Sequence, residues 1–364
     1  MNALLLHEFH QALGAKFTEV NGLEVVESYG DALEEHAALR KSAGFFDLSF
    51  RSRLCLTGAD RRKFLHGQVT NDVNRLSVGE GCYAALVNAK GKIQSDLNIY
   101  LLENEILLDF EPGYSSAVAQ RLEKYIIADD VQLVDAAPHY GLLSVQGPRA
   151  TEAVRQLGLG VEPPEKPMSF VLRKDSALGE VYLMNVVRTG RCGFDLFVPT
   201  AALGAVADKL IGAVKAAGGR ACGWQALEIA RIETGIPRFG ADMDESNLAP
   251  ETGIETRGIS YAKGCYIGQE VIARIRTYGQ VAKALSGLRL CGDIKAMPAK
   301  GDKLFKDGKE VGYITSAITS PTLKGNIALG YVRREANEIG TELVVRTAEA
   351  DCPATIVTLP FVNE

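Results

Sequence analysis

The amino-acid sequence predicts an α+β fold with two similar α+β subdomains and a C-terminal all-β barrel. Three observations predict it. The chain has 364 residues, more than a single core usually organises. A strand-helix plan that begins near residue 54 occurs again near residue 142. After Gly279 the sequence changes to short strands separated by glycine, proline and aspartate.

The first copy of the plan begins with a strand at 54–57. A short helix follows through Leu65, and Asp60 is placed to cap its exposed amides. We expect further strands near 82–88, 92–102 and 105–110, and a helix over 114–127.

The second copy begins with a strand at 142–145 and a turn at Gly147. The next helix has its apolar residues three and four positions apart, over 150–157. Strands at 181–187 and 194–199 precede a second amphipathic helix over 203–214. Both copies resemble the split β-α-β unit of ferredoxin-like folds. The alternative is a chance likeness between two ordinary α+β stretches.

The C-terminal segment predicts a small barrel. Its expected strands lie at 284–290, 303–305, 310–316, 326–332, 343–346 and 354–359. The predicted domains are therefore 1–279, with subdomain divisions near 50 and 140, and 280–364.

Composition narrows the class of protein. Lys and Arg total 40 against 45 Asp and Glu, so the net charge of −5 argues against general nucleic-acid binding. No run of 18 apolar residues predicts a membrane span. The start of the chain lacks the features of a secretory signal. Seven scattered cysteines fit a reducing, cytoplasmic location, and neither they nor the histidines have metal-ligand spacing.

One face of an expected strand carries polar side chains that could bind a ligand. Alternation over 91–100 places Gln94, Asp96, Asn98 and Tyr100 on the face opposite its apolar residues. A carboxylate beside amides and a phenol can hydrogen-bond a heterocycle with donor nitrogens, such as a pterin. The alternative is a strand face open to water.

Two weaker polar signals lie further along the chain. Glu228 and Arg231 recur at helical spacing, so Arg231 could bind a carboxylate or pair with Glu228. Arg188 and Asp195 flank a glycine-punctuated turn that could expose either side chain.

Cys265 stands between two glycines, Gly264 and Gly268, just before a helix predicted to begin at Gln269. A thiol near a helix N-terminus and near cations gains thiolate character, and Lys263, Arg274 and Arg276 are the candidate cations. Glu270, in the first turn, opposes the effect. The alternative is that Cys265 is a small buried apolar residue.

Ordered motifs over nearly the whole chain resemble the aminomethyltransferase (glycine-cleavage T-protein) superfamily. Those that carry the resemblance are Glu34–Arg40, Ala43–Ser49, Ala230–Gly235, Phe239–Asp244, Thr315–Leu323, Asn326–Leu329 and Leu359–Phe361. The resemblance implies two interlocked α+β subdomains and a barrel, arranged as a cloverleaf around a central channel that binds tetrahydrofolate or a one-carbon derivative. It also implies folate contacts at Tyr83, Asp96 and Tyr100, and at Asp195 and Arg231.

The octet Lys263-Gly264-Cys265-Tyr266-Ile267-Gly268-Gln269-Glu270 is very similar to the KGCYxGQE signature of the folate-binding YgfZ-type branch. Members of that branch assist iron–sulfur cluster assembly or repair. The chain also departs from usual T-proteins: the segment after Arg188 is shorter, Ser95-Asp96 replaces paired aspartates, and Phe239 replaces a tyrosine.

From these motifs we predict a tetrahydrofolate-binding, YgfZ-type accessory protein for iron–sulfur clusters, with Asp96 and Cys265 as the functional groups. The alternative is a tetrahydrofolate-dependent aminomethyltransferase. The expected partners are folate and either iron–sulfur client proteins or a lipoyl carrier protein, and a monomer suits a channel formed within one chain.

Overall fold

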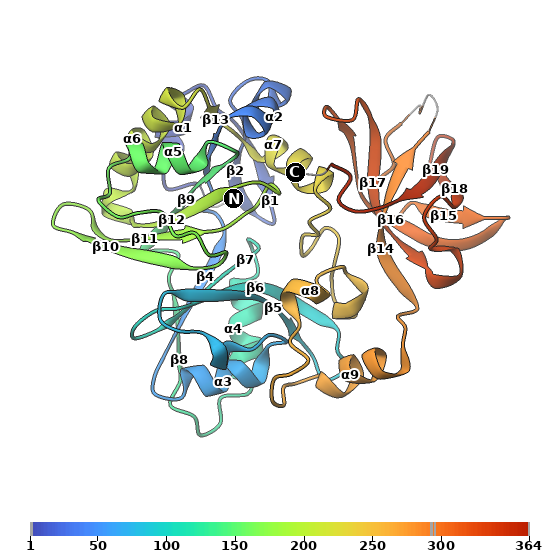
Figure 1. The fold of residues 1–364 in the computed structure, drawn as a ribbon, viewed down its shortest axis with the longest axis horizontal. Helices are drawn as coiled ribbons and strands as arrows, with labels where there is room; N and C mark the ends of the chain where they lie inside the picture. Colours follow the sequence, from blue (N-terminus) through green and yellow to red (C-terminus); the bar gives the residue numbers. More distant parts are fainter. Residues whose placement is uncertain (1–2, 292–293, 295, 363–364) are drawn as a thin grey trace. The chain divides into compact units, whose positions relative to one another are not determined.

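The structure, a computed structural model, describes residues 3–291, 294 and 296–362. The chain divides into two compact units. Figure 1 draws their helices and strands, coloured along the sequence. The first unit comprises Met1–Ala84 and Ser95–Glu228, and the second comprises Ala85–Gln94 and Ile229–Glu364.

The first sheet has five strands in the order β5-β6-β7-β4-β8. Their bounds are β4 Ser52–Thr57, β5 Glu80–Val87, β6 Ile93–Leu101, β7 Ile106–Phe110 and β8 Gln132–Asp135, with helices α3 Arg61–Gln68, η1 Val73–Arg75 and α4 Ser115–Glu123. Asp60 does not cap α3 with its side chain. Its Oδ2 instead accepts a hydrogen bond from the backbone N–H of Asp130, so this expected cap was wrong.

The second sheet has six strands in the order β10-β11-β12-β9-β3-β13. Their bounds are β3 Gly44–Asp47, β9 Tyr140–Gln146, β10 Phe170–Asp175, β11 Gly179–Asn185, β12 Gly193–Pro199 and β13 Arg220–Ala221, with helices α5 Ala150–Gln156, η2 Thr200–Ala202 and α6 Leu203–Ala216. The apolar stripe of α6 and the apolar face of α5 join the strands in one buried cluster.

The two sheets are built from the same series of elements, strand-helix-three strands-helix-strand. The first series runs from β4 to β8 and the second from β9 to β13. In each, the first strand pairs antiparallel with the last strand of the three-stranded run, β4 with β7 and β9 with β12. The repeat expected from the sequence is present in the order of its elements.

The remaining elements of the N-terminal segment precede this repeat. They are α1 His7–Ala12, β1 Lys16–Val20, β2 Leu23–Ser28 and α2 Ala32–Lys41. β1 and β2 form a separate two-stranded sheet. Helix α7, Trp224–Glu233, continues the chain from the first unit into the second.

The second unit contains a closed barrel in the order β14-β17-β16-β15-β18-β19. Its strands are β14 Lys283–Leu290, β15 Lys303–Lys306, β16 Lys309–Ser320, β17 Gly325–Arg333, β18 Glu342–Arg346 and β19 Asp351–Val357. The helices of this unit are η3 Ala249–Glu251, α8 Glu255–Gly258, α9 Gln269–Tyr278 and η4 Arg334–Ala336. Closure pairs every strand on both sides and leaves no free edge.

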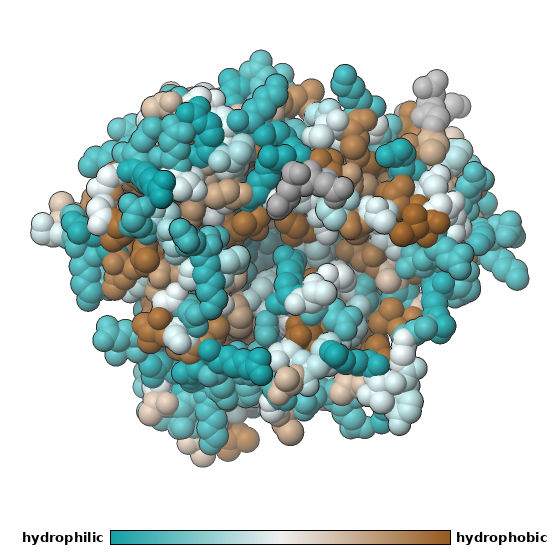
Figure 2. Space-filling view, in the orientation of Figure 1, coloured by the Kyte–Doolittle hydropathy of each residue, from teal (hydrophilic) through white to brown (hydrophobic). Residues whose placement is uncertain are grey.

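The barrel and the mixed α/β class confirm the predicted fold class. The boundary predicted at residue 279, the cloverleaf arrangement and the central channel stay predictions. No helix within 3–291, 294 and 296–362 is long and apolar enough to cross a membrane. On the face that Figure 2 displays, polar residues are widespread and hydrophobic ones form small separate patches.

Candidate functional site

The polar face of β6 carries the candidate site in the first unit. Along β6, burial alternates from Ile93 to Ile99, with Asp96 and Asn98 half-buried and the residues between them buried. Tyr83 lies on the neighbouring strand β5, and its hydroxyl donates a 2.9 Å hydrogen bond to Oδ2 of Asp96. The sheet thus brings together two of the predicted folate contacts.

Tyr100, on the same strand, is fully buried. Its ring makes edge contacts with Phe170 and Phe197, each at a centroid distance of 6.2 Å. Within the described residues its hydroxyl has no hydrogen-bond partner. Burial, and then the carboxylates of Asp195 and Asp109, raise the pKa of Tyr100 well above its ordinary value, so the hydroxyl keeps its proton. A buried O–H donor without a partner is costly in a folded protein and is suited to a bound acceptor.

Asp195 is fully buried beside Tyr100, which is not the exposure that its turn had led us to expect. Nε of Arg188 donates to its Oδ1 at 3.2 Å and to its Oδ2 at 3.0 Å, and Nη2 donates to Oδ2 at 2.6 Å. Arg188 is itself largely buried. The expectation that the turn exposes one of these side chains was wrong, because each neutralises the other inside the unit.

The ion pair extends into a buried network. Asp109 is fully buried and accepts hydrogen bonds from Arg188 at 2.9 Å, from Arg51 at 2.7 Å and from the amide of Asn98 at 3.0 Å. Burial alone would raise the pKa of Asp109, but the two guanidinium groups outweigh it and hold that pKa well below its ordinary range. The network therefore fixes Asn98, which lies two positions from Asp96 on the same face of β6.

Arg231 lies in the second unit, on α7. Its guanidinium pairs with the buried carboxylate of Asp242 and donates a 3.0 Å hydrogen bond to the hydroxyl of Ser316. Asp242 also accepts hydrogen bonds from the hydroxyls of Thr315 and Ser316. The carboxylate that Arg231 binds here is one of the chain's own, and a role for Arg231 towards a ligand stays a prediction.

The segment around Cys265 also lies in the second unit. Cys265 is exposed, so it is not the buried apolar residue of the alternative interpretation. The three candidate cations have other contacts: Lys263 lies over the ring of Tyr266 at 4.8 Å, Arg276 lies over the ring of Tyr261 at 4.0 Å, and Arg274 pairs with Glu270 at 2.6 Å. Each cation that the sequence suggests for the thiol therefore contacts another side chain.

The predicted helix is present as α9, which begins at Gln269. Gly268 precedes it with a φ of 82°, and a Cβ on Gly268 would lie 2.5 Å from the carbonyl oxygen of Asn88. This close approach explains the glycine. Gly264 is not among the described glycines with positive φ, so only one of the two glycines has the expected conformation.

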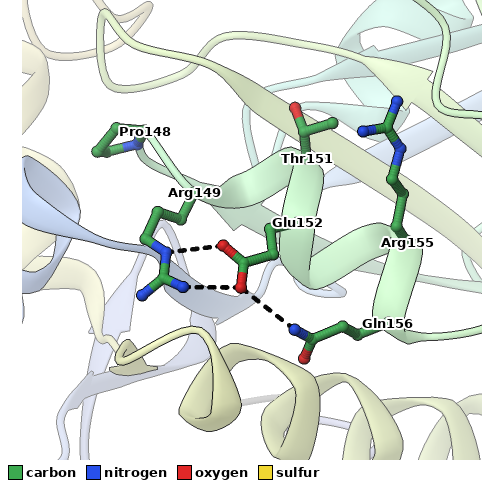
Figure 3. A pocket seen from close by; sticks show the side chains of 6 residues that line it. All are labelled: Pro148, Arg149, Thr151, Glu152, Arg155 and Gln156. Atoms are coloured by element: carbon green, nitrogen blue, oxygen red, sulfur yellow. Dashed lines mark hydrogen bonds and ion pairs between the residues drawn. The ribbon is translucent and has the colours of Figure 1, made fainter.

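Two further features lie outside this polar face. A surface cavity of about 490 Å³ beside α5 is lined by Pro148, Arg149, Thr151, Glu152, Arg155 and Gln156 (Figure 3). Its charges are already paired, since Arg149 binds both oxygens of Glu152 and Arg155 pairs with Glu162. In the described part of the chain, no group of three or more His, Cys, Asp or Glu side chains could hold a metal ion.

Comparison with known proteins covers both predicted regions. The family model for the GCVT N-terminal domain matches residues 6–257, and the model for the glycine cleavage T-protein C-terminal barrel domain matches residues 283–363. The chain belongs to the glycine cleavage T-protein family. The structure is also similar to the crystal structure of glycine cleavage system aminomethyltransferase T from Bartonella henselae, with a TM-score of 0.89 and 25% sequence identity. The match covers 99% of this chain and 98% of that chain.

Curated T-protein relatives match over the same length. The aminomethyltransferase of Thermosynechococcus vestitus is 30% identical, with 98% of this chain and 94% of the relative covered. That of Halalkalibacterium halodurans is 29% identical over 98% of this chain and 96% of the relative. That of Bacillus subtilis is 28% identical over 98% of both proteins.

These relatives correct the functional prediction. They are named aminomethyltransferase and match end to end, so the predicted iron–sulfur accessory function was wrong and the alternative agrees better. The Lys263–Glu270 octet is one short segment, whereas the T-protein motifs are distributed along the whole chain.

Sequence reasoning had selected Arg188, the partner of Asp195, but neither Asp242, which pairs with Arg231, nor Asp109, which pairs with Arg188. Asp242 lies inside the Phe239–Asp244 motif, and Asp109 is a lone carboxylate in an apolar strand, ILLDF. A charged residue within an otherwise apolar strand is a signal for a buried pair. The sequence does not say which arginine it meets.

Proposed function

We propose that this protein is a tetrahydrofolate-dependent aminomethyltransferase. The observation that carries the proposal is the end-to-end match of both T-protein domains to proteins named aminomethyltransferase. The hydrogen-bonded pair of Tyr83 and Asp96 supports it, because it places a carboxylate on the strand face that the resemblance assigns to folate.

The proposed donor is an aminomethyl group carried on the lipoyl arm of a carrier protein. Its carbon loses one bond to sulfur and one to nitrogen, and it gains two bonds to nitrogens of tetrahydrofolate. The products are methylenetetrahydrofolate, the reduced lipoyl arm with its thiol protonated, and ammonium. The two protons released by the folate nitrogens are taken up by the thiolate and by ammonia, so the reaction needs no oxidant.

Asp96 is the proposed catalytic group. Near the folate nitrogens, its carboxylate would stabilise the cationic, iminium-like carbon, orient the attacking nitrogen and relay its proton. The hydroxyl of Tyr83 restrains Oδ2 of Asp96, and the buried hydroxyl of Tyr100 offers a donor for the heterocycle. The chemistry of these groups fits a folate.

Asp195 and Arg231 stay predicted folate contacts. Each is already bound to an opposite charge, Asp195 to Arg188 and Arg231 to Asp242. A direct contact with folate would therefore use a remaining lone pair or N–H group and not a free charge.

The test is a transfer assay with an aminomethyl-loaded lipoyl carrier protein, which measures ammonia and methylenetetrahydrofolate together. We expect both products in equal amounts and only when tetrahydrofolate is present. Absence of turnover with this donor and with other methylamine donors, despite measurable folate binding, would remove the proposal.

Cys265 stays a candidate functional thiol in this reaction, and Cys265→Ala in the same assay decides it. We also propose that the segment Lys263–Glu270 is related in sequence to the corresponding segment of the YgfZ-type branch. This proposal concerns the origin of the segment and not the activity of the protein. The monomeric state is likewise a proposal, which sedimentation of the purified protein tests.

A further inference from the structure

A second cavity lies within the first unit, and one of the rings that line it, Phe197, also contacts the ring of Tyr100. It has a volume of about 220 Å³ and is lined by side chains from both sheets: Cys55, Leu102, Glu105, Leu107, Val134, Ala136, His139, Tyr140, Tyr182 and Phe197. None of these is a residue of the proposed transfer site.

The walls of the cavity are mainly apolar and aromatic. The rings of Tyr140 and Tyr182 meet edge to face at a centroid distance of 6.1 Å. Phe197 and Leu107 are buried, whereas Val134 is 44% exposed. A solvent-accessible valine beside buried aromatic rings indicates an apolar mouth that a ligand could cover.

Glu105 is the one carboxylate that lines the cavity. Burial, and then the nearby carboxylate of Glu105, raise the pKa of the Cys55 thiol, so the thiol stays protonated and adds no charge. In the described part of the chain, Glu105 forms no ion pair with lysine, arginine or histidine, and His139 pairs with no carboxylate. The cavity therefore holds a negative charge whose counter-charge the chain does not supply.

The phenols do not add to that charge. Burial, and then nearby carboxylates that include Glu105, raise the pKa of Tyr140 and of Tyr182, so both hydroxyls stay neutral. Their ring faces carry negative quadrupole density, which attracts a cation placed within about 6 Å of a centroid. The carboxylate and the aromatic walls therefore both favour a positively charged ligand.

From this arrangement we propose that the cavity binds a small organic cation, namely an ammonium group that carries apolar substituents. Its charge would meet Glu105 through a charge-assisted contact, and its alkyl groups would lie against Tyr140, Tyr182 and Phe197. An apolar cavity of about 150 Å³ accepts a benzene-sized ligand, so 220 Å³ admits a branched ammonium of similar size. An anion would be repelled by Glu105, and a neutral apolar ligand would leave that carboxylate without compensation.

The test uses choline and its uncharged analogue of the same shape, 3,3-dimethylbutan-1-ol, titrated into the full-length protein and followed by calorimetry. We expect choline to bind at least tenfold more tightly than the alcohol. Glu105→Gln should weaken choline binding at least tenfold and leave the alcohol unchanged. Tyr182→Leu should weaken choline more than the alcohol.

Glu103→Gln is the matched control. Glu103 is exposed in the same turn and does not line the cavity, so its substitution should leave choline binding unchanged. Near-ultraviolet circular dichroism establishes that each variant is folded. Equal affinity for the two ligands, no choline binding at tens of millimolar, or unchanged binding in Glu105→Gln would each overturn the proposal.

Discussion

The hydroxyl of Tyr83 donates a 2.9 Å hydrogen bond to Oδ2 of Asp96 across neighbouring strands. This bond gives the carboxylate one preferred orientation on the face of β6. Restraint of a catalytic group by a neighbour reduces the reorganisation that the reaction requires. The first two predictions follow from this pair.

Asp96→Asn should lower the rate of methylenetetrahydrofolate formation about 100-fold or more, because the amide is uncharged and cannot take up a proton. The substitution preserves shape, so folate binding should weaken less than turnover. The measurement is a steady-state transfer assay alongside folate titration. An Asp96→Asn variant with full turnover would exclude Asp96 from the chemical step.

Tyr83→Phe should have a smaller effect, since it removes a single hydrogen bond whose net value is about 0.5–1.5 kcal/mol. The expected loss in turnover is about tenfold or less, and the melting temperature should fall by no more than about 2–4 °C. A loss as large as that of Asp96→Asn would indicate that Tyr83 acts directly on the substrate.

The stability of the protein should decrease in acid because of Asp109. Its pKa is depressed in the folded state, so its ion pairs contribute stability that is complete above the pKa of an unfolded aspartate, about 4, and is lost as the pH falls below it. Urea unfolding at pH 7, 5, 4 and 3 measures this loss. Asp109→Asn should be less stable at pH 7, by about 3–5 kcal/mol, and should lose less stability between pH 5 and pH 3. An identical acid dependence in both proteins would assign the effect to other groups.

Gly268→Ala should destabilise the second unit more than Gly279→Ala. Both glycines flank α9 with positive φ, of 82° and 102°, so an alanine at either carries a backbone cost of about 1–2 kcal/mol. A Cβ at Gly268 would also meet the carbonyl oxygen of Asn88 at 2.5 Å, whereas a Cβ at Gly279 meets nothing within 4 Å. Chemical denaturation measures the free energy of unfolding of each variant. Equal losses of stability in the two variants would contradict a cost from the contact with Asn88.

Thiol labelling of the native protein should separate the seven cysteines by exposure. Cys192, Cys265 and Cys291 are exposed and should react quickly with an aromatic disulfide reagent, whereas Cys55 and Cys222 should react only on unfolding. Burial raises the pKa of both of these thiols, which slows them further. Mass spectrometry of partially labelled protein assigns the sites, and slow labelling of Cys265 would contradict its exposed position.

Local patterns in the sequence were sufficient for much of the fold. Alternation along 91–100 predicted which side chains of β6 share a face, and the Gly268-Gln269 pair predicted the start of α9. The repeat of strand-helix plans and the run of short strands predicted the two sheets and the barrel. These features depend on periodicity and on backbone preferences, which are properties of neighbouring residues.

The sequence by itself determined the fold class, the T-protein resemblance and the polar face around Asp96. Only the tertiary structure decided that Arg188 neutralises Asp195, that Arg231 holds Asp242, and that Glu105 lies without a counter-charge in an aromatic cavity. The physical reason is that charge pairing and burial depend on how the chain folds, even between residues only 7 or 11 positions apart, as in these two pairs. No local pattern specifies which of many arginines will meet a given carboxylate.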